Sequence, residues 1–211
     1  MKSLSRLVWI CGTFFLLITS PSCSSLLLGD EMKTLQKANI FMLSKDGQSI
    51  ILDGVINSSA LKKFKELYTQ NPNVKSVDIV NCDGSIDDET NLKLASFIHE
   101  KGLNTHLEDH GLIASGGTDL FLAGINRTMG KDTKIGVHSW AGNGKKGKIV
   151  TAKDFPKDHK NHQPYIVYYK SIGFSQEQAE DFYFFTINAA SAEDIYWMKE
   201  EEIRKYQLLT E

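Results

Sequence analysis

The feature that most constrains the fold is a regular alternation of strand-like and helix-like segments over residues 38–137. Short apolar or β-branched runs, such as residues 74–80, are followed by stretches with apolar side chains three or four positions apart. This alternation predicts right-handed βαβ crossovers and a largely parallel sheet flanked by helices, an α/β class. The predicted strands are residues 38–43, 49–52, 74–80, 104–107 and 134–138. The predicted helices are residues 58–70, 87–101, 165–172, 176–186 and 192–206, the last broken near Met198, and residues 140–148 are predicted to be a loop.

The first 22 residues have the pattern of a secretory signal. Lys2 and Arg6 precede an apolar run over residues 7–18, which is short for a membrane span, and small residues follow it. Ser22-Cys23 resembles a bacterial lipoprotein cleavage site, where Cys23 becomes the lipidated first residue. A plain cleaved signal and an uncleaved anchor remain alternatives. We therefore expect an exported bacterial protein, periplasmic or membrane-anchored.

The remaining chain fits one domain. We assign residues 1–22 to the signal, 23–37 to a tether and 38–211 to the domain, because no repeat or long linker interrupts the last segment. The net charge of −2 and the scattered charges argue against nucleic-acid binding. Cysteines are present at positions 11, 23 and 82; if Cys23 is lipidated, only Cys82 is left and no intrachain disulfide can form.

Residues 111–124 (GLIASGGTDLFLAG) interrupt an apolar run with Ser115-Gly116-Gly117. A helix that starts near Ser115 has unpaired N–H groups and the positive end of its dipole there. The N–H of Gly116 could donate to an oxyanion, and Gly84, in the turn after the preceding strand, could supply a second donor. A pair of such donors stabilises the charge that develops in acyl transfer. The alternative is a plain turn without chemistry.

A serine nucleophile also needs a base and an acid that orients the base. His138 ends the next predicted strand, and adjacent parallel strands bring their carboxyl ends together, so His138 can reach Ser115. The candidate acids are Asp194, Glu193 and Asp181. Asp194 is preferred because it precedes an apolar Ile-Tyr-Trp-Met run that could hold it rigid.

These motifs resemble the Clp protease and crotonase superfamily, and most of all its exported, periplasmic Clp-like serine hydrolases. The resemblance covers roughly residues 45–210 and rests on five features: Gly54 before a helix, the turn at residues 81–85, Ser115 opening a helix that ends in Ala-Gly, the Ile-x-x-His strand end, and the closing segment 203–210. It implies a Ser115, His138 and Asp194 triad with Gly84 and Gly116 as oxyanion donors. It also implies a peptide or acyl substrate, no cofactor, and a possible homo-oligomer.

The chain departs from the family at two places. The family's oxyanion turn is Asn-Ser-Pro-Gly-Gly, whereas residues 81–85 are Asn-Cys-Asp-Gly-Ser, so Asp83 puts a carboxylate beside the expected oxyanion. Gly116 stands where the Clp proteases carry Met or Ala. Two functions follow: an exported serine hydrolase, in particular a peptidase, or a non-catalytic exported binding or scaffold protein on the same fold. Acyl-CoA chemistry is disfavoured because an exported protein meets little coenzyme A.

Histidines outside this set do not suggest a metal site. His106, His110, His159 and His162 lack carboxylate or cysteine partners at ligand spacing. We expect no metal, and we expect His159 and His162 to lie on a solvated loop.

Overall fold

The computed structural model describes residues 38–210, so the predicted signal, the tether and Cys23 lie outside the described residues. Within them, a seven-stranded sheet has the order β1-β2-β3-β4-β6-β9, and β5 pairs with β4. Strands β2, β3, β4 and β6 are parallel, whereas β1 and β9 join the two edges antiparallel. The predicted α/β class with a largely parallel sheet is therefore confirmed. The strands are β1 (Phe41–Leu43), β2 (Ser49–Asp53), β3 (Ser76–Cys82), β4 (Asn104–Ala114), β5 (Arg127–Met129), β6 (Lys134–Val137) and β9 (Tyr196–Trp197).

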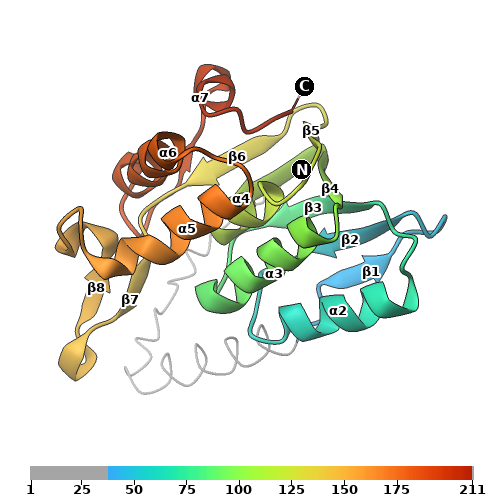
Figure 1. The fold of residues 1–211 in the computed structure, drawn as a ribbon, viewed down its shortest axis with the longest axis horizontal. Helices are drawn as coiled ribbons and strands as arrows, with labels where there is room; N and C mark the ends of the chain where they lie inside the picture. Colours follow the sequence, from blue (N-terminus) through green and yellow to red (C-terminus); the bar gives the residue numbers. More distant parts are fainter. Residues whose placement is uncertain (1–37, 211) are drawn as a thin grey trace, which may run out of the picture. The chain divides into compact units, whose positions relative to one another are not determined.

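Helices cover the sheet because their apolar sides are buried against it. Helices α2, α3 and α5 lie side by side on one face (Figure 1). Phe64 of α2 and Leu94 and Ile98 of α3 are fully buried, as are Ile50 and Ile79 of the strands beneath them. Removing this apolar surface from water is the main stabilisation of the layer. The helices are α2 (Ala60–Gln70), α3 (Asp88–Glu100), α4 (Gly116–Phe121), α5 (Gln163–Ser171), α6 (Gln176–Ala189) and α7 (Glu200–Lys205).

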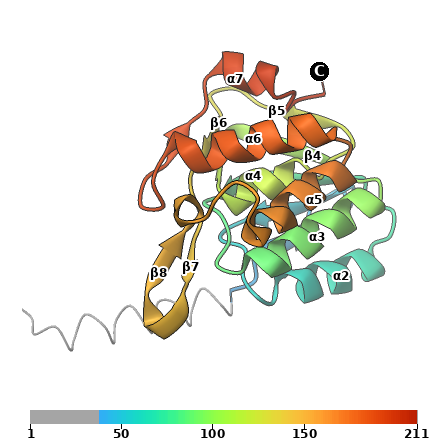
Figure 2. The same cartoon turned by 60° about the vertical axis from the view of Figure 1, so that its left-hand side comes forward.

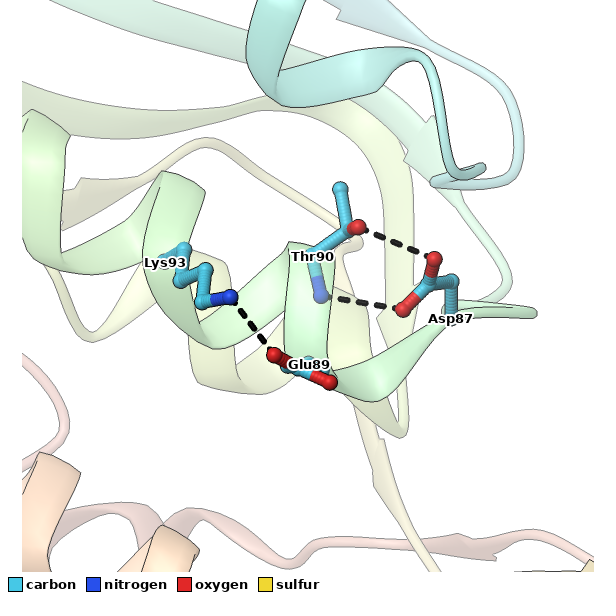
Figure 3. A network of polar contacts seen from close by, with 4 residues as sticks. All are labelled: Asp87, Glu89, Thr90 and Lys93. Atoms are coloured by element: carbon cyan, nitrogen blue, oxygen red, sulfur yellow. Dashed lines mark hydrogen bonds and ion pairs between the residues drawn. The ribbon is translucent and has the colours of Figure 1, made fainter.

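The start of α3 is fixed by a side-chain cap. Asp87 accepts hydrogen bonds from the backbone N–H of Thr90 at 3.0 Å and from its hydroxyl at 2.9 Å (Figure 3). One turn further, Lys93 and Glu89 form an exposed ion pair. A cap of this kind stabilises a helix by about 1 kcal/mol. It also fixes the first turn of α3, which carries Asp88 and Asn91 toward the site.

Three regions differ from the sequence prediction. Residues 140–148 are not simply a loop: β7 (Ala141–Asn143) and β8 (Ile149–Thr151) form an antiparallel hairpin that extends away from the sheet and helices (Figure 2). Residues 192–206 are not a broken helix, because β9 precedes the short helix α7. Strand β4 continues seven residues past the predicted end at Leu107. Short 3₁₀ helices occupy Lys145–Gly147, Ala152–Asp154 and Lys160–His162.

Among the described residues, no helix has the length and apolar character needed to cross a membrane.

Candidate active site

The carboxyl ends of three adjacent strands meet at one edge of the sheet. Cys82 at the end of β3 is paired with Ile113 of β4, and Ala114 at the end of β4 is paired with Gly136 of β6. Gly84, Ser115 and His138 each follow one of these strand ends within two residues. The topology therefore brings the predicted oxyanion donor, nucleophile and base to one place.

Ser115 occupies the turn between β4 and α4 in an unusual backbone conformation. It is the N-cap of α4, with φ 51° and ψ −126°. Its N–H donates to the Gly136 carbonyl at 3.0 Å, and its own carbonyl accepts from the N–H of Thr118 at 2.9 Å. A non-glycine residue in this region costs on the order of 1–3 kcal/mol. The surrounding strands and helix hold Ser115 in this strained turn.

Ser115 and His138 share two hollows. Both line an outer cleft of about 330 Å³ and an inner cavity of about 30 Å³. The two side chains are therefore on the same side of the site, although within residues 38–210 no hydrogen bond joins them. In apo sites the catalytic hydrogen bonds are often long or poorly aligned and tighten only when substrate binds.

Gly84 packs against Ser115, and Gly116 follows Ser115 directly in the chain. A Cβ on Gly84 would lie 3.0 Å from the Ser115 Cβ and 3.5 Å from its Oγ, and Gly84 has a φ of 131° that favours glycine. Gly116 is the first residue of α4, so its N–H has no acceptor within the helix. In the described part of the chain, no backbone acceptor is seen for the Gly84 N–H. Both N–H groups are therefore free to donate to a bound oxygen.

Packing explains why residue 116 is glycine rather than Met or Ala. A Cβ there would overlap the Ser85 hydroxyl and lie 2.8 Å from the Asn91 amide nitrogen, which itself donates to the Gly116 carbonyl at 2.8 Å. At Gly117, a Cβ would lie 2.5 Å from the Cys82 carbonyl oxygen. Asn91 and Cys82 thus approach the start of α4 so closely that only glycines fit.

Cys82 lies buried beneath this turn. Burial raises the pKa of its thiol to about 12, so the thiol stays protonated and unreactive.

Asp194 does not contact His138 in this structure. The residue is exposed, and its carboxylate accepts from the Ser191 hydroxyl at 3.3 Å. The neighbouring Ile195 lines the outer cleft. The Nδ1 atom of His138 is buried and has no hydrogen-bond partner among the described residues. The role of Asp194 as the third member of a triad therefore stays a prediction.

Two carboxylates near the serine, the half-buried Asp88 and the buried Asp119, were missed from the sequence. Asp88 of α3 and Asp119 of α4 both line the inner cavity with Ser115 and His138. Asp119 is 8% exposed, and its Oδ1 accepts from the Tyr169 hydroxyl at 2.6 Å. Burial raises the pKa of the Asp119 carboxyl to about 7, against the lowering effect of that hydrogen bond. The sequence contained one indication that Asp119 lies near Ser115: residue 119 is four positions after residue 115, one turn into the helix that follows the serine.

Tyrosines complete the cavity wall. Tyr165 donates to Asp88 at 2.7 Å, and burial together with that carboxylate raises the tyrosine pKa. Tyr183 accepts from the Trp140 indole N–H at 2.9 Å and is bonded to His162 Nδ1 at 2.7 Å. The inner cavity is therefore lined by both apolar and polar side chains, with two carboxylates and, among the described residues, His138 as the one basic group.

His162 is buried, so its predicted place on a solvated loop was wrong. It is 1% exposed, and its second ring nitrogen lies 3.0 Å from the Pro156 carbonyl. Both nitrogens are occupied by protein partners, which leaves none for a metal. No group of three or more potential metal ligands occurs in residues 38–210.

No protein-family model and no curated protein matches the sequence. Among solved structures, the chain is similar to the 1510-N membrane-bound stomatin-specific protease in complex with a substrate peptide, with 20% identity, a TM-score of 0.52, and coverage of 77% of this chain and 72% of that one. It is also similar to the ClpP protease catalytic domain from Plasmodium falciparum, with 13% identity, a TM-score of 0.52, and coverage of 93% of each chain.

The chain has the ClpP-like fold. A second structure of the stomatin-specific protease agrees, with 21% identity, a TM-score of 0.51, and coverage of 77% of this chain and 76% of that one. The Clp protease/crotonase-like fold predicted from the motifs is thus confirmed. At these identities the likeness establishes the ClpP-like fold alone.

Proposed function

We propose that this protein is a serine hydrolase that cleaves peptides, with Ser115 as nucleophile and His138 as base. The observation that carries the proposal is the strained Ser115 at the start of α4, which shares two hollows with His138. Gly84 packs against Ser115 and Gly116 follows it in the chain, and both N–H groups are free to donate. This arrangement supports acyl transfer through an oxyanion.

The reaction follows from these roles. The Ser115 oxygen attacks the substrate carbonyl, and its proton passes to His138. The N–H groups of Gly84 and Gly116 hold the oxyanion that forms. His138 then returns the proton to the leaving amine, and the acyl group stays on Ser115. A water molecule, deprotonated by His138, attacks the acyl-enzyme and releases the acid, which restores the serine.

A peptide is the substrate that the cleft supports best. The outer cleft of about 330 Å³ has apolar side chains from Val55, Ile86 and Ile195 on its walls, beside Ser115 and His138. A protease of the same fold has been solved with a substrate peptide. We also propose that the protein is exported and held at a membrane by its N-terminal segment, which rests on the signal pattern with Cys23.

Labelling with a fluorophosphonate probe tests the proposal. The purified protein should be labelled covalently, Ser115→Ala should abolish labelling, and His138→Ala should slow it strongly. Ser171→Ala, which changes an exposed serine at the end of α5, serves as the control and should label normally. A folded protein that resists the probe would instead support the non-catalytic binding or scaffold function.

A further inference from the structure

His138 has a nitrogen that the described protein does not satisfy. Its Nδ1 atom is buried without a hydrogen-bond partner among residues 38–210. A base in acyl transfer works best when an acceptor holds this nitrogen's proton, because that fixes the tautomer and stabilises the imidazolium that forms. A buried nitrogen without a partner is also unfavourable, so a turn of the ring toward a polar partner is favoured.

The inner cavity offers that partner. With about 30 Å³, it has room for a water molecule, and polar groups line it. Of its two carboxylates, Asp88 already accepts from Ser85 at one oxygen and from Tyr165 at the other. The Oδ1 atom of Asp119 accepts a hydrogen bond from Tyr169, and no described residue donates to its Oδ2 atom. The Oδ2 atom can therefore accept from another donor.

We propose that Asp119 is the acid that orients His138, acting across the inner cavity through a bridging water molecule. The inference rests on the proposed function of Ser115 and His138. Asp119 is a positioning residue: the water accepts the Nδ1–H of His138 and donates to Asp119 Oδ2, and no proton leaves the imidazole toward the carboxylate. The opposite nitrogen is then free to take the Ser115 proton.

Burial favours Asp119 over Asp194 for this role. An exposed carboxylate such as Asp194 is screened by water and already accepts from Ser191. Asp119 is surrounded by protein, where a carboxylate stabilises an imidazolium more strongly. Because its pKa is about 7, its ionised fraction rises through neutral pH, and the rate should rise with it. The groups that face Asp119 across the cavity are Asp88, His138, Tyr165, Tyr169 and Tyr183, and Tyr168 donates to its backbone carbonyl.

The first experiment measures the tautomer of His138 directly and does not depend on catalytic activity. Nitrogen-15 NMR of the folded protein gives the tautomer of His138, whose signals are assigned by their loss in His138→Gln. We expect the Nδ1–H tautomer in the wild type, and a shift of the tautomer balance in Asp119→Asn. Asp181→Asn, an exposed aspartate on α6, is the control and should leave the signals in place.

The second experiment measures peptide hydrolysis against pH. Asp119→Asn should lower kcat roughly tenfold or more near pH 8 with little change in KM, because Asp119 lines the inner cavity and not the outer cleft in which we propose that the peptide binds. Tyr169→Phe removes the hydrogen bond that lowers the Asp119 pKa, so the rise of kcat with pH should move to higher pH. This second variant tests the inference if Asp119→Asn does not fold.

The outcomes separate the two proposals. If the wild type is not labelled by the fluorophosphonate, the proposed function fails, and NMR still decides whether Asp119 sets the His138 tautomer. A loss of activity in Asp194→Asn with none in Asp119→Asn would overturn the inference. So would an unchanged His138 tautomer in Asp119→Asn, or a kcat profile that Tyr169→Phe does not move.

Discussion

The buried carboxyl of Asp119 should make the protein less stable as the pH rises. Its pKa of about 7, compared with the ordinary value of 3.8, means that the native state holds this proton when the unfolded chain has already lost it. Between these two values each pH unit removes about 1.4 kcal/mol from the free energy of unfolding, or about 4 kcal/mol in all. The contribution is fully present below pH 3.8 and is lost by about pH 7.

Asp119→Asn removes this dependence with little change in shape. The amide oxygen of Asn can still accept from Tyr169, which donates to Oδ1 in the wild type. We therefore expect the variant to match the wild type in stability near pH 4 and to exceed it by about 4 kcal/mol at pH 8. A stabilised but inactive variant would mean that the buried carboxylate is retained for function at the expense of stability.

Urea unfolding at pH 5 and at pH 8 measures the effect. The free energy of unfolding of the wild type should fall by about 3 kcal/mol relative to Asp119→Asn between these two conditions. Taking the difference removes the pH dependence of the other groups, and Asp181→Asn should follow the wild type. If the two curves stay parallel over this range, the carboxyl is not held protonated by burial, and the reasoning is refuted.

Three further predictions concern the turn, the cleft and the leader. Ser115→Gly relieves the strained backbone, so this variant should be more stable than Ser115→Ala by about 1 kcal/mol in urea unfolding. Equal stabilities of the two variants would show that the backbone at residue 115 is not strained. Asp83 lines the outer cleft beside Gly84, so Asp83→Asn should raise hydrolysis of an activated ester several-fold, and an unchanged rate would make Asp83 a turn former only. Cys23→Ala should release the protein from the membrane fraction if Cys23 is lipidated, and a full-length chain found soluble in the cytoplasm would refute export.

The alternation of strands and helices could be predicted from the sequence, because β2, β3 and β4 each pair with the next strand along the chain. The periodicity of α2 and α3 and the β-branched run of β3 place these elements within two residues of their observed bounds. Strand β4 was cut short at Leu107 because Glu108, Asp109 and His110 interrupt its apolar pattern. The strand nevertheless continues to Ala114, because Leu112 and Ile113 pair with both β3 and β6. Such pairing between distant segments leaves no local signal.

The candidate site was partly readable for the same reason. Ser115 and His138 follow parallel strands that are adjacent in the sheet, so the carboxyl ends of these strands bring them together. Asp119 was missed because an acidic residue in the first turn of a helix is usually exposed, where its charge interacts favourably with the helix dipole. Here α4 is buried along its whole length, so Asp119 lines the inner cavity instead of facing solvent. Burial of this kind depends on α5, whose tyrosines cover α4 from 50 residues away in the chain.

The buried thiol of Cys82, beneath the turn at Ser115, can be used as a probe of whether this part of the protein is folded. Cys82 is inaccessible and protonated as long as β3 and α4 stay packed, so a maleimide cannot react with it in the native state. Alkylation of the folded protein should therefore exclude Cys82, so the state of Cys11 and Cys23 tests whether the N-terminal segment is processed as predicted. Modification of Cys82, detected by mass spectrometry, marks molecules in which the turn at Ser115 has opened.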